Sequence, residues 1–153
     1  MASLLILGTI VIALSTFTNA AYNLMDFIHS ETRPDINGDW RAEVIYDWPN
    51  AKYSETFTFR GDGEEVHGTA SFLRTKRGIL EGKANRDQIR FITKTQEVLG
   101  DSGSSKEVVH RYEGQVLGDE IKFVMQTEGG YSEHIPIEFT VRRVPDTMLQ
   151  PAN

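Results

Sequence analysis

The chain has 153 residues, of which 39% are hydrophobic and 25% are charged, and its formal net charge is −6. This length suits one domain with an appendage, and the composition is that of a folded chain rather than a disordered one. The negative charge and the lack of a basic stripe argue against nucleic-acid binding. Because the chain contains no cysteine, disulfides, thiolate metal ligands and thiol nucleophiles are excluded.

The chain begins with an uncharged, largely apolar stretch that runs to Met25. A helix of about 20 residues, rising about 1.5 Å per residue, spans the roughly 30 Å hydrocarbon core of a bilayer. The sequence therefore predicts a transmembrane helix within residues 1–30. The rival interpretation is a cleaved secretory signal ending near Ala20, but this stretch lacks the Lys or Arg typical of such signals. Residues expected to contact lipid or partner helices, including small residues that permit close packing, are Leu5, Gly8, Ile12, Ser15 and Tyr22.

A breaker-rich linker over residues 31–37 follows the predicted anchor. Beyond it, apolar and polar residues alternate with period two, which indicates β-strands. We expect a barrel domain over residues 38–144 and a C-terminal tail over residues 145–153. Basic residues flanking the helix are too few to fix its orientation. The acidic domain favours an extracytoplasmic location, which in a bacterium is the periplasm.

Eight strands are predicted, most of them joined by short turns that imply neighbouring antiparallel strands. In chain order they are Trp40–Tyr46, Tyr53–Phe59, Val66–Leu73, Gly78–Ala84, Gln88–Thr95, Val108–Val116, Glu120–Thr127 and His134–Arg142. Their apolar side chains share one face, and no helix remains to cover it. We therefore predict an all-β, up-and-down barrel of about eight strands. A two-sheet sandwich is the alternative.

Alternation also divides the side chains between the interior and the outer wall. Large residues assigned to the interior include Phe57, Phe59, Phe91, Tyr112 and Phe123. Three apolar residues fall on the outer face and are candidate partner contacts, namely Ile92, Val109 and Val124.

An internal repeat supports the hairpin pattern. Glu81–Phe91 aligns without gaps on Glu113–Phe123, and both segments read E-G-x-x-x-x-D-x-I-x-F. The glycine suits a crowded or bent strand, the aspartate suits a tight turn, and the Ile and Phe suit the inner face. Hairpin repetition of this kind favours an up-and-down meander.

The start of the first predicted strand, Asn37-Gly38-Asp39-Trp40, resembles the G-x-W signature of the calycin barrels, which are the lipocalins and their relatives. The repeat is also similar to small lipocalin-like domains of bacterial proteins. The resemblance implies a barrel closed at one end by a basic residue that packs over the tryptophan. Arg142 and Arg143 are the candidates, and parity favours Arg143, so the expected closure set is Gly38, Trp40 and Arg143.

No motif for catalysis, metal binding or cofactor binding is recognisable. The four histidines lack metal-ligand spacing, and no nucleophile elbow, P-loop or dinucleotide fingerprint is present. We therefore expect no catalytic residue, no metal and no cofactor. His110 and Tyr112 are expected to form a satisfied inner pair or, alternatively, to orient a ligand. The longest predicted loop, Gln96–Glu107, is a candidate lid or partner contact, and Pro136 predicts an irregular seam between the last and first strands.

Together these features favour a non-catalytic, membrane-anchored accessory subunit of a larger membrane complex of the respiratory, photosynthetic or transport kind. Its expected partners are other integral membrane subunits and the lipid bilayer, with no nucleic acid. The alternative function is a membrane-tethered, lipocalin-like binder of a small apolar ligand. That alternative requires an interior cavity of several hundred Å³.

Overall fold

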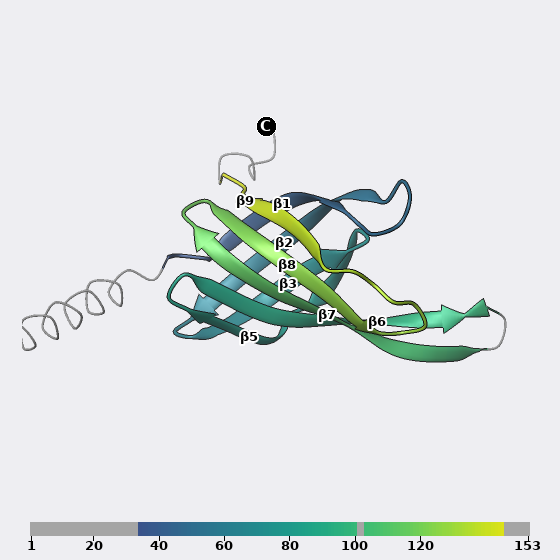
Figure 1. The fold of residues 1–153 in the computed structure, drawn as a ribbon. Helices are drawn as coiled ribbons and strands as arrows, with labels where there is room; N and C mark the ends of the chain where they lie inside the picture. Colours follow the sequence, from purple (N-terminus) through teal and green to yellow (C-terminus); the bar gives the residue numbers. More distant parts are fainter. Residues whose placement is uncertain (1–33, 101–102, 146–153) are drawn as a thin grey trace, which may run out of the picture. The chain divides into compact units, whose positions relative to one another are not determined.

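The computed structural model describes residues 34–100 and 103–145 (Figure 1). The predicted anchor helix lies outside these residues, as do the contact residues expected on it: Leu5, Gly8, Ile12, Ser15 and Tyr22. Residues 146–153 of the predicted tail also lie outside them. In the part of the chain that the structure describes, no helix has the length and apolarity needed to cross a bilayer.

The described residues form nine β-strands. They are β1 (Gly38–Ile45), β2 (Lys52–Asp62), β3 (Glu65–Phe72), β4 (Thr75–Gly78), β5 (Leu80–Asn85), β6 (Gln88–Leu99), β7 (Ser104–Leu117), β8 (Glu120–Gly129) and β9 (Ile137–Arg143). Eight of them follow the order β2-β1-β9-β8-β7-β6-β5-β3, and β3 pairs back onto β2 to close an antiparallel barrel. Strand β4 pairs with the end of β3. The predicted eight-stranded barrel is confirmed, and the sandwich alternative is wrong.

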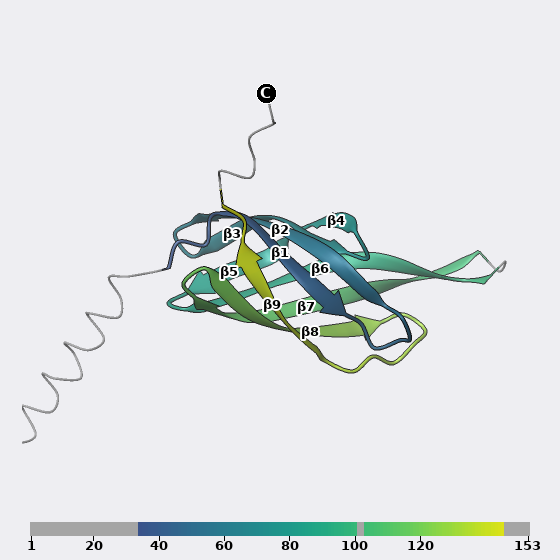
Figure 2. The same cartoon turned by 90° about the horizontal axis from the view of Figure 1, so that it is seen from above.

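Two segments differ from the prediction. The predicted strand Gly78–Ala84 is divided, because β4 ends at Gly78 and β5 begins at Leu80. The predicted loop Gln96–Glu107 is largely strand, since β6 and β7 continue to pair from Gln96↔Glu107 to Leu99↔Ser104. This two-stranded extension runs away from the barrel rather than folding over its mouth as a lid (Figures 1 and 2).

Two of the ladders that close the barrel are short. Strands β1 and β9 pair only at Trp40↔Arg143 and Arg41↔Arg142, and β3 and β5 pair only at Glu65↔Lys83. By contrast, β1 and β2 share eight residue pairs. Pro136 lies just before β9, so its missing N–H removes no bond from within that strand.

Aromatic rings pack together in the centre of the barrel. Phe91 stacks on Tyr112 with ring centroids 4.5 Å apart, and Phe57 stacks on Phe123 at 6.0 Å. Phe59 lies 5.7 Å from Phe91, and none of these five side chains is more than 2% exposed. Such offset and edge-to-face ring contacts add to the stabilisation from burial. The rings that alternation assigned to the interior are therefore the barrel core.

The repeated glycines mark two places where the backbone is crowded. A Cβ on Gly82 would lie 2.0 Å from the carbonyl oxygen of Val66, and one on Gly114 would lie 2.5 Å from the Phe123 ring. These distances are shorter than any normal van der Waals contact. The repeat therefore reflects close packing in both of its hairpins, and neither site tolerates a side chain without local displacement.

Candidate functional site

Arg143 packs over Trp40 at one end of the barrel, here named the closed end. Its guanidinium carbon lies 4.3 Å from the centroid of the Trp40 ring, and its Nε donates a 2.8 Å hydrogen bond to the Asp119 carboxylate. The two terminal nitrogens donate to the backbone carbonyls of Asn37 and Asp35. Arg143 thus combines a cation–π contact with hydrogen bonds that only a forked guanidinium provides at once.

The closure also fixes the segment by which the chain enters the barrel. The Trp40 indole N–H donates a 3.0 Å hydrogen bond to the carbonyl of Ile36, and the Ile36 side chain is buried. Gly38 has φ of 127°, and a Cβ there would lie 3.1 Å from Arg143 Nη1. Arg142, the other candidate, instead pairs with Glu120 at 2.8 Å on the outer wall. The structure therefore brings Gly38, Trp40 and Arg143 together at one end.

A buried carboxylate lies in the other half of the barrel. Glu55 is 0% exposed, and its Oε1 accepts a 2.9 Å hydrogen bond from the Tyr46 hydroxyl. The Ser71 hydroxyl donates to Oε2, and the Arg74 amide donates at 3.1 Å. Burial, followed by the charge of Glu55, raises the pKa of Tyr46, so Tyr46 remains a donor. A buried carboxylate with three donors is satisfied internally.

This carboxylate holds a tight turn. Leu73 and Arg74 form the two-residue connection between β3 and β4, with φ of 51° and 63°. Two successive positive φ values are the pattern of type I′ hairpins, which favour Asn-Gly. Side chains in this region of φ and ψ cost roughly 1–2 kcal/mol each. The hydrogen bond from the Arg74 amide to Glu55 opposes that cost, so Glu55 has a clear structural role.

His110 is a further buried ionisable group of this half. Its Nε2 lies 2.9 Å from the Thr95 hydroxyl, and its Nδ1 lies 3.0 Å from the Thr127 hydroxyl. The Phe72 ring stacks on the imidazole at 3.9 Å. Burial lowers the pKa of His110 to about 4, so the ring is neutral near pH 7. Its hydrogen-bond partners are threonines rather than Tyr112, and at 1% exposure it has no access to bulk solvent.

Two buried polar atoms in the described residues make no hydrogen bond, namely Arg77 Nε and Thr93 Oγ1. Burial raises the pKa of Tyr112, and the nearby Thr93 lowers it by a smaller amount. Tyr112 is therefore a protonated core residue.

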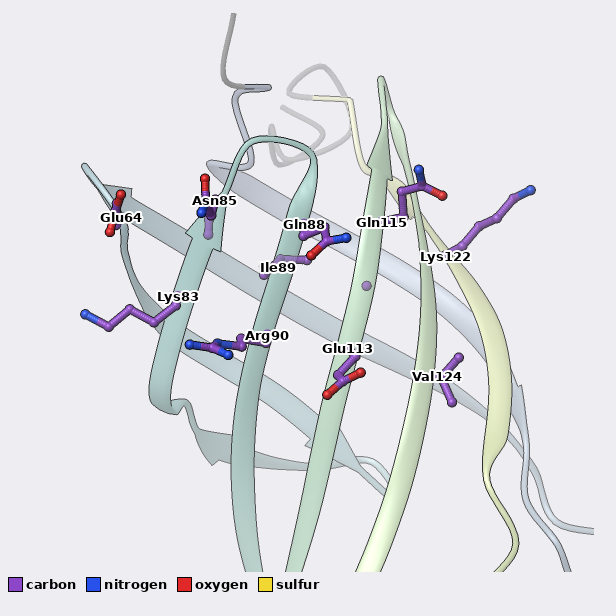
Figure 3. A pocket seen from close by; sticks show the side chains of 12 residues that line it. Glu64, Lys83, Asn85, Gln88, Ile89, Arg90, Glu113, Gln115, Lys122 and Val124 are labelled. Carbon is purple, nitrogen blue, oxygen red and sulfur yellow. The ribbon is translucent and has the colours of Figure 1, made fainter. Parts of the chain in front are cut away.

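A hollow of about 790 Å³ crosses the outer wall over β5–β8 (Figure 3). Its charged side chains are of both signs, with Lys83, Arg90 and Lys122 beside Glu64 and Glu113. Asn85, Gln88 and Gln115 add amide groups. All eight side chains belong to exposed residues, and Figure 3 shows several of them pointing in different directions. The hollow therefore lacks the convergent polar groups of an organised binding site.

The extension of β6 and β7, residues 96–99 and 104–107, is here named the ribbon. Among the nine described strands, no third one pairs with it. Near its base, Glu97 accepts a 2.6 Å hydrogen bond from the amide of Tyr131, and the Lys106 ammonium lies 4.4 Å from the Tyr131 ring centroid. Near its tip, Val98 is 61% exposed and Leu99 is 53% exposed.

The three apolar residues predicted on the outer wall differ in exposure. Val124 is 43% exposed, whereas Ile92 is only 6% exposed, and Val109 is intermediate. Ile92 pairs with Leu80 and with Arg111 on the neighbouring strands. The prediction of Ile92 as an accessible partner contact is therefore wrong.

Sequence reasoning missed the Glu55 cluster, and it missed the strand pairing of the ribbon although it named Gln96–Glu107 as a candidate partner contact. One signal for Glu55 was present, because its parity matches Phe57 and Phe59 on the inner face.

Across residues 34–100 and 103–145, no three His, Asp or Glu side chains gather as metal ligands would.

The fold defines a small, closed, antiparallel β-barrel of eight strands. No protein-family model matches the sequence, and no match is found among curated proteins or solved structures. The likeness to lipocalins therefore depends on the G-x-W motif, the barrel and the packing of Arg143 over Trp40.

Proposed function

We propose that this chain is a non-catalytic, membrane-anchored accessory subunit of a larger membrane complex, and that its barrel acts through its outer surface. The packed interior supports this proposal most strongly. Five aromatic rings, each no more than 2% exposed, occupy the space in which a lipocalin would hold its ligand. A barrel of about eight strands is just wide enough for its own side chains to fill.

The state of the buried ionisable groups is a second support. The hydrogen-bonding capacity of Glu55 is used by Tyr46, Ser71 and the β3–β4 turn. His110 is held between two threonines and is 1% exposed. A general acid or base must reach its substrate directly or through one water. Both groups are better explained as parts of the fold than as catalytic residues.

The anchor completes the proposal. The uncharged stretch within residues 1–30 is long enough for one membrane span, and the acidic domain after it favours the extracytoplasmic side. Leu5, Gly8, Ile12, Ser15 and Tyr22 are the proposed helix contacts with lipid and with other integral subunits. The alternative, a tethered binder of an apolar ligand, retains the support of the Trp40–Arg143 closure but has the ring packing against it.

Gentle detergent extraction followed by native sizing tests this function. We expect the full-length chain to migrate with a particle much larger than itself and to remain with it through a second separation. Migration as a small, monodisperse species would contradict the subunit proposal. Native mass spectrometry of the same sample tests the alternative, because a bound apolar ligand adds a discrete mass.

A further inference from the structure

The tip of the ribbon presents apolar side chains on both of its faces. Successive residues of a strand point to opposite sides, so Val98 and Leu99, at 61% and 53% exposed, lie on opposite faces of the ribbon. Single exposed apolar residues are common on protein surfaces and need no explanation. Here, however, two adjacent ones occupy the end of an element that projects beyond every other strand (Figures 1 and 2).

The ribbon is also tied to the barrel at its base. Glu97 accepts hydrogen bonds from the Tyr131 amide and from the Ser132 hydroxyl, at 2.6 and 3.4 Å. Lys106 packs over the Tyr131 ring. An isolated two-stranded hairpin is marginally stable in water, so these contacts from the β8–β9 segment hold the ribbon extended. A tip held in place in this way loses less conformational entropy on binding than a flexible loop would.

The tip lies at the opposite end of the barrel from the point where the chain enters. Residues 35–37 enter at the closed end, where Arg143 and Trp40 hold their carbonyls. Strand β6 starts near that end at Gln88 and runs 12 residues to Leu99, which is about 40 Å of extended chain. The described chain therefore enters the barrel at the end opposite to the tip.

We propose that the ribbon inserts its tip, Val98 and Leu99, into an apolar cleft on an extramembrane part of another polypeptide in the same complex. This inference rests on the proposed function, because it names the partner of an accessory subunit. A cleft fits better than a flat surface because both faces of the tip carry apolar side chains. A polypeptide fits better than lipid because the tip points away from the end at which residues 35–37 enter the barrel.

Paired substitutions test the tip against a matched control. Val98→Ser with Leu99→Ser removes one valine and one leucine from the tip. Ile45→Ser with Leu117→Ser removes one β-branched residue and one leucine from other exposed sites, at 67% and 46% exposed. The full-length chains are extracted gently and sized in a dilution series. We expect the tip variant to bind its complex roughly 30-fold more weakly than the unchanged chain, and the control to bind as before.

Photocrosslinking then identifies what the tip touches. The chain has no cysteine of its own, so Leu99→Cys and Leu117→Cys each provide one site for a photoreactive maleimide. In native membranes, the label at position 99 should form an adduct that maps to an extramembrane, apolar segment of a subunit of the complex. The label at position 117 should not form that adduct.

The other outcomes separate the two proposals. If both paired variants stay in the complex, or both leave it equally, the ribbon inference is overturned while the subunit function stands. Adducts of position 99 with lipid would also overturn it. If the unchanged chain runs alone, the subunit function fails and the inference fails with it. Thermal melts of both paired variants, expected to match the unchanged chain, show that a lost interaction is not a loss of fold.

Discussion

Acidification should destabilise the barrel through His110. The pKa of this imidazole is about 4 in the folded chain, against 6.5 for an unperturbed histidine. Burial is the main cause, and the nearby charges of His134 and Arg77 act in the same direction. Because both threonine hydroxyls can accept as well as donate, protonation costs desolvation rather than a hydrogen bond. The folded state therefore resists the proton that the unfolded chain takes up readily.

The sign and size of the pH effect on stability follow from the difference between the folded and unfolded pKa of His110. A depressed folded-state pKa contributes stability above the unfolded value, and that stability is lost as the pH falls from 6.5 toward about 4. Between about pH 7 and about pH 4.5 the free energy of unfolding should fall by about 2 kcal/mol through His110 alone.

Urea unfolding at both pH values measures this loss. The suitable sample lacks residues 1–33 and should fold alone, because every described strand begins after residue 37. His110→Gln should reduce the pH dependence by about 2 kcal/mol, whatever its effect on absolute stability. His67→Gln is the control, because His67 is exposed. If the His110→Gln chain loses stability as steeply as the unchanged chain, the buried imidazole is not the cause and the reasoning is wrong.

Three further predictions concern the fold. In urea titrations Gly118→Ala should lower the free energy of unfolding by about 1 kcal/mol through its φ of 65° alone, since an added Cβ would have no heavy atom within 4 Å. Gly114→Ala should lower it by about 2–3 kcal/mol, because the added Cβ would meet the Phe123 ring. Glu55→Ala should cost about 3 kcal/mol, because three donors lose their buried acceptor, and should speed hydrogen exchange in the β3–β4 turn. Arg143→Lys should cost about 1 kcal/mol and shift the tryptophan fluorescence, because an ammonium cannot reproduce the forked contacts.

The barrel was predictable because the pattern that specifies it lies within each strand of the sequence. Period-two alternation assigns Phe57, Phe91 and Phe123 to one face without knowledge of any partner strand, and a one-residue change of register would expose all of them. The repeat at Gly82 and Gly114 adds the positions where the backbone is crowded. Extra strand β4 escaped prediction because it depends on the turn that Glu55 holds from a distant strand.

The sequence predicted the residues of the closed end but not the partners of Glu55, and the difference is physical. Parity alone distinguishes Arg143 from Arg142, since one shares the inner face and the other does not. Parity is not enough to identify Glu55 as buried, because a charged residue between Ser54 and Thr56 is expected to be solvated unless its hydrogen-bond donors are known. Those donors lie at Tyr46, Ser71 and Arg74, and only the closed barrel brings them together.

The ribbon escaped prediction for a different reason, and that reason bears on its role. The glycines and serines around positions 100–104 are typical of a loop in sequence, but β6 continues to Leu99 and β7 begins at Ser104. Glu97 in this extension accepts a hydrogen bond from the β8–β9 segment. Val98 and Leu99 are exposed, so they add little to the stability of the barrel. Folding therefore gives no reason for two apolar residues at that position. A partner that buries them supplies one, and the paired substitutions test it directly.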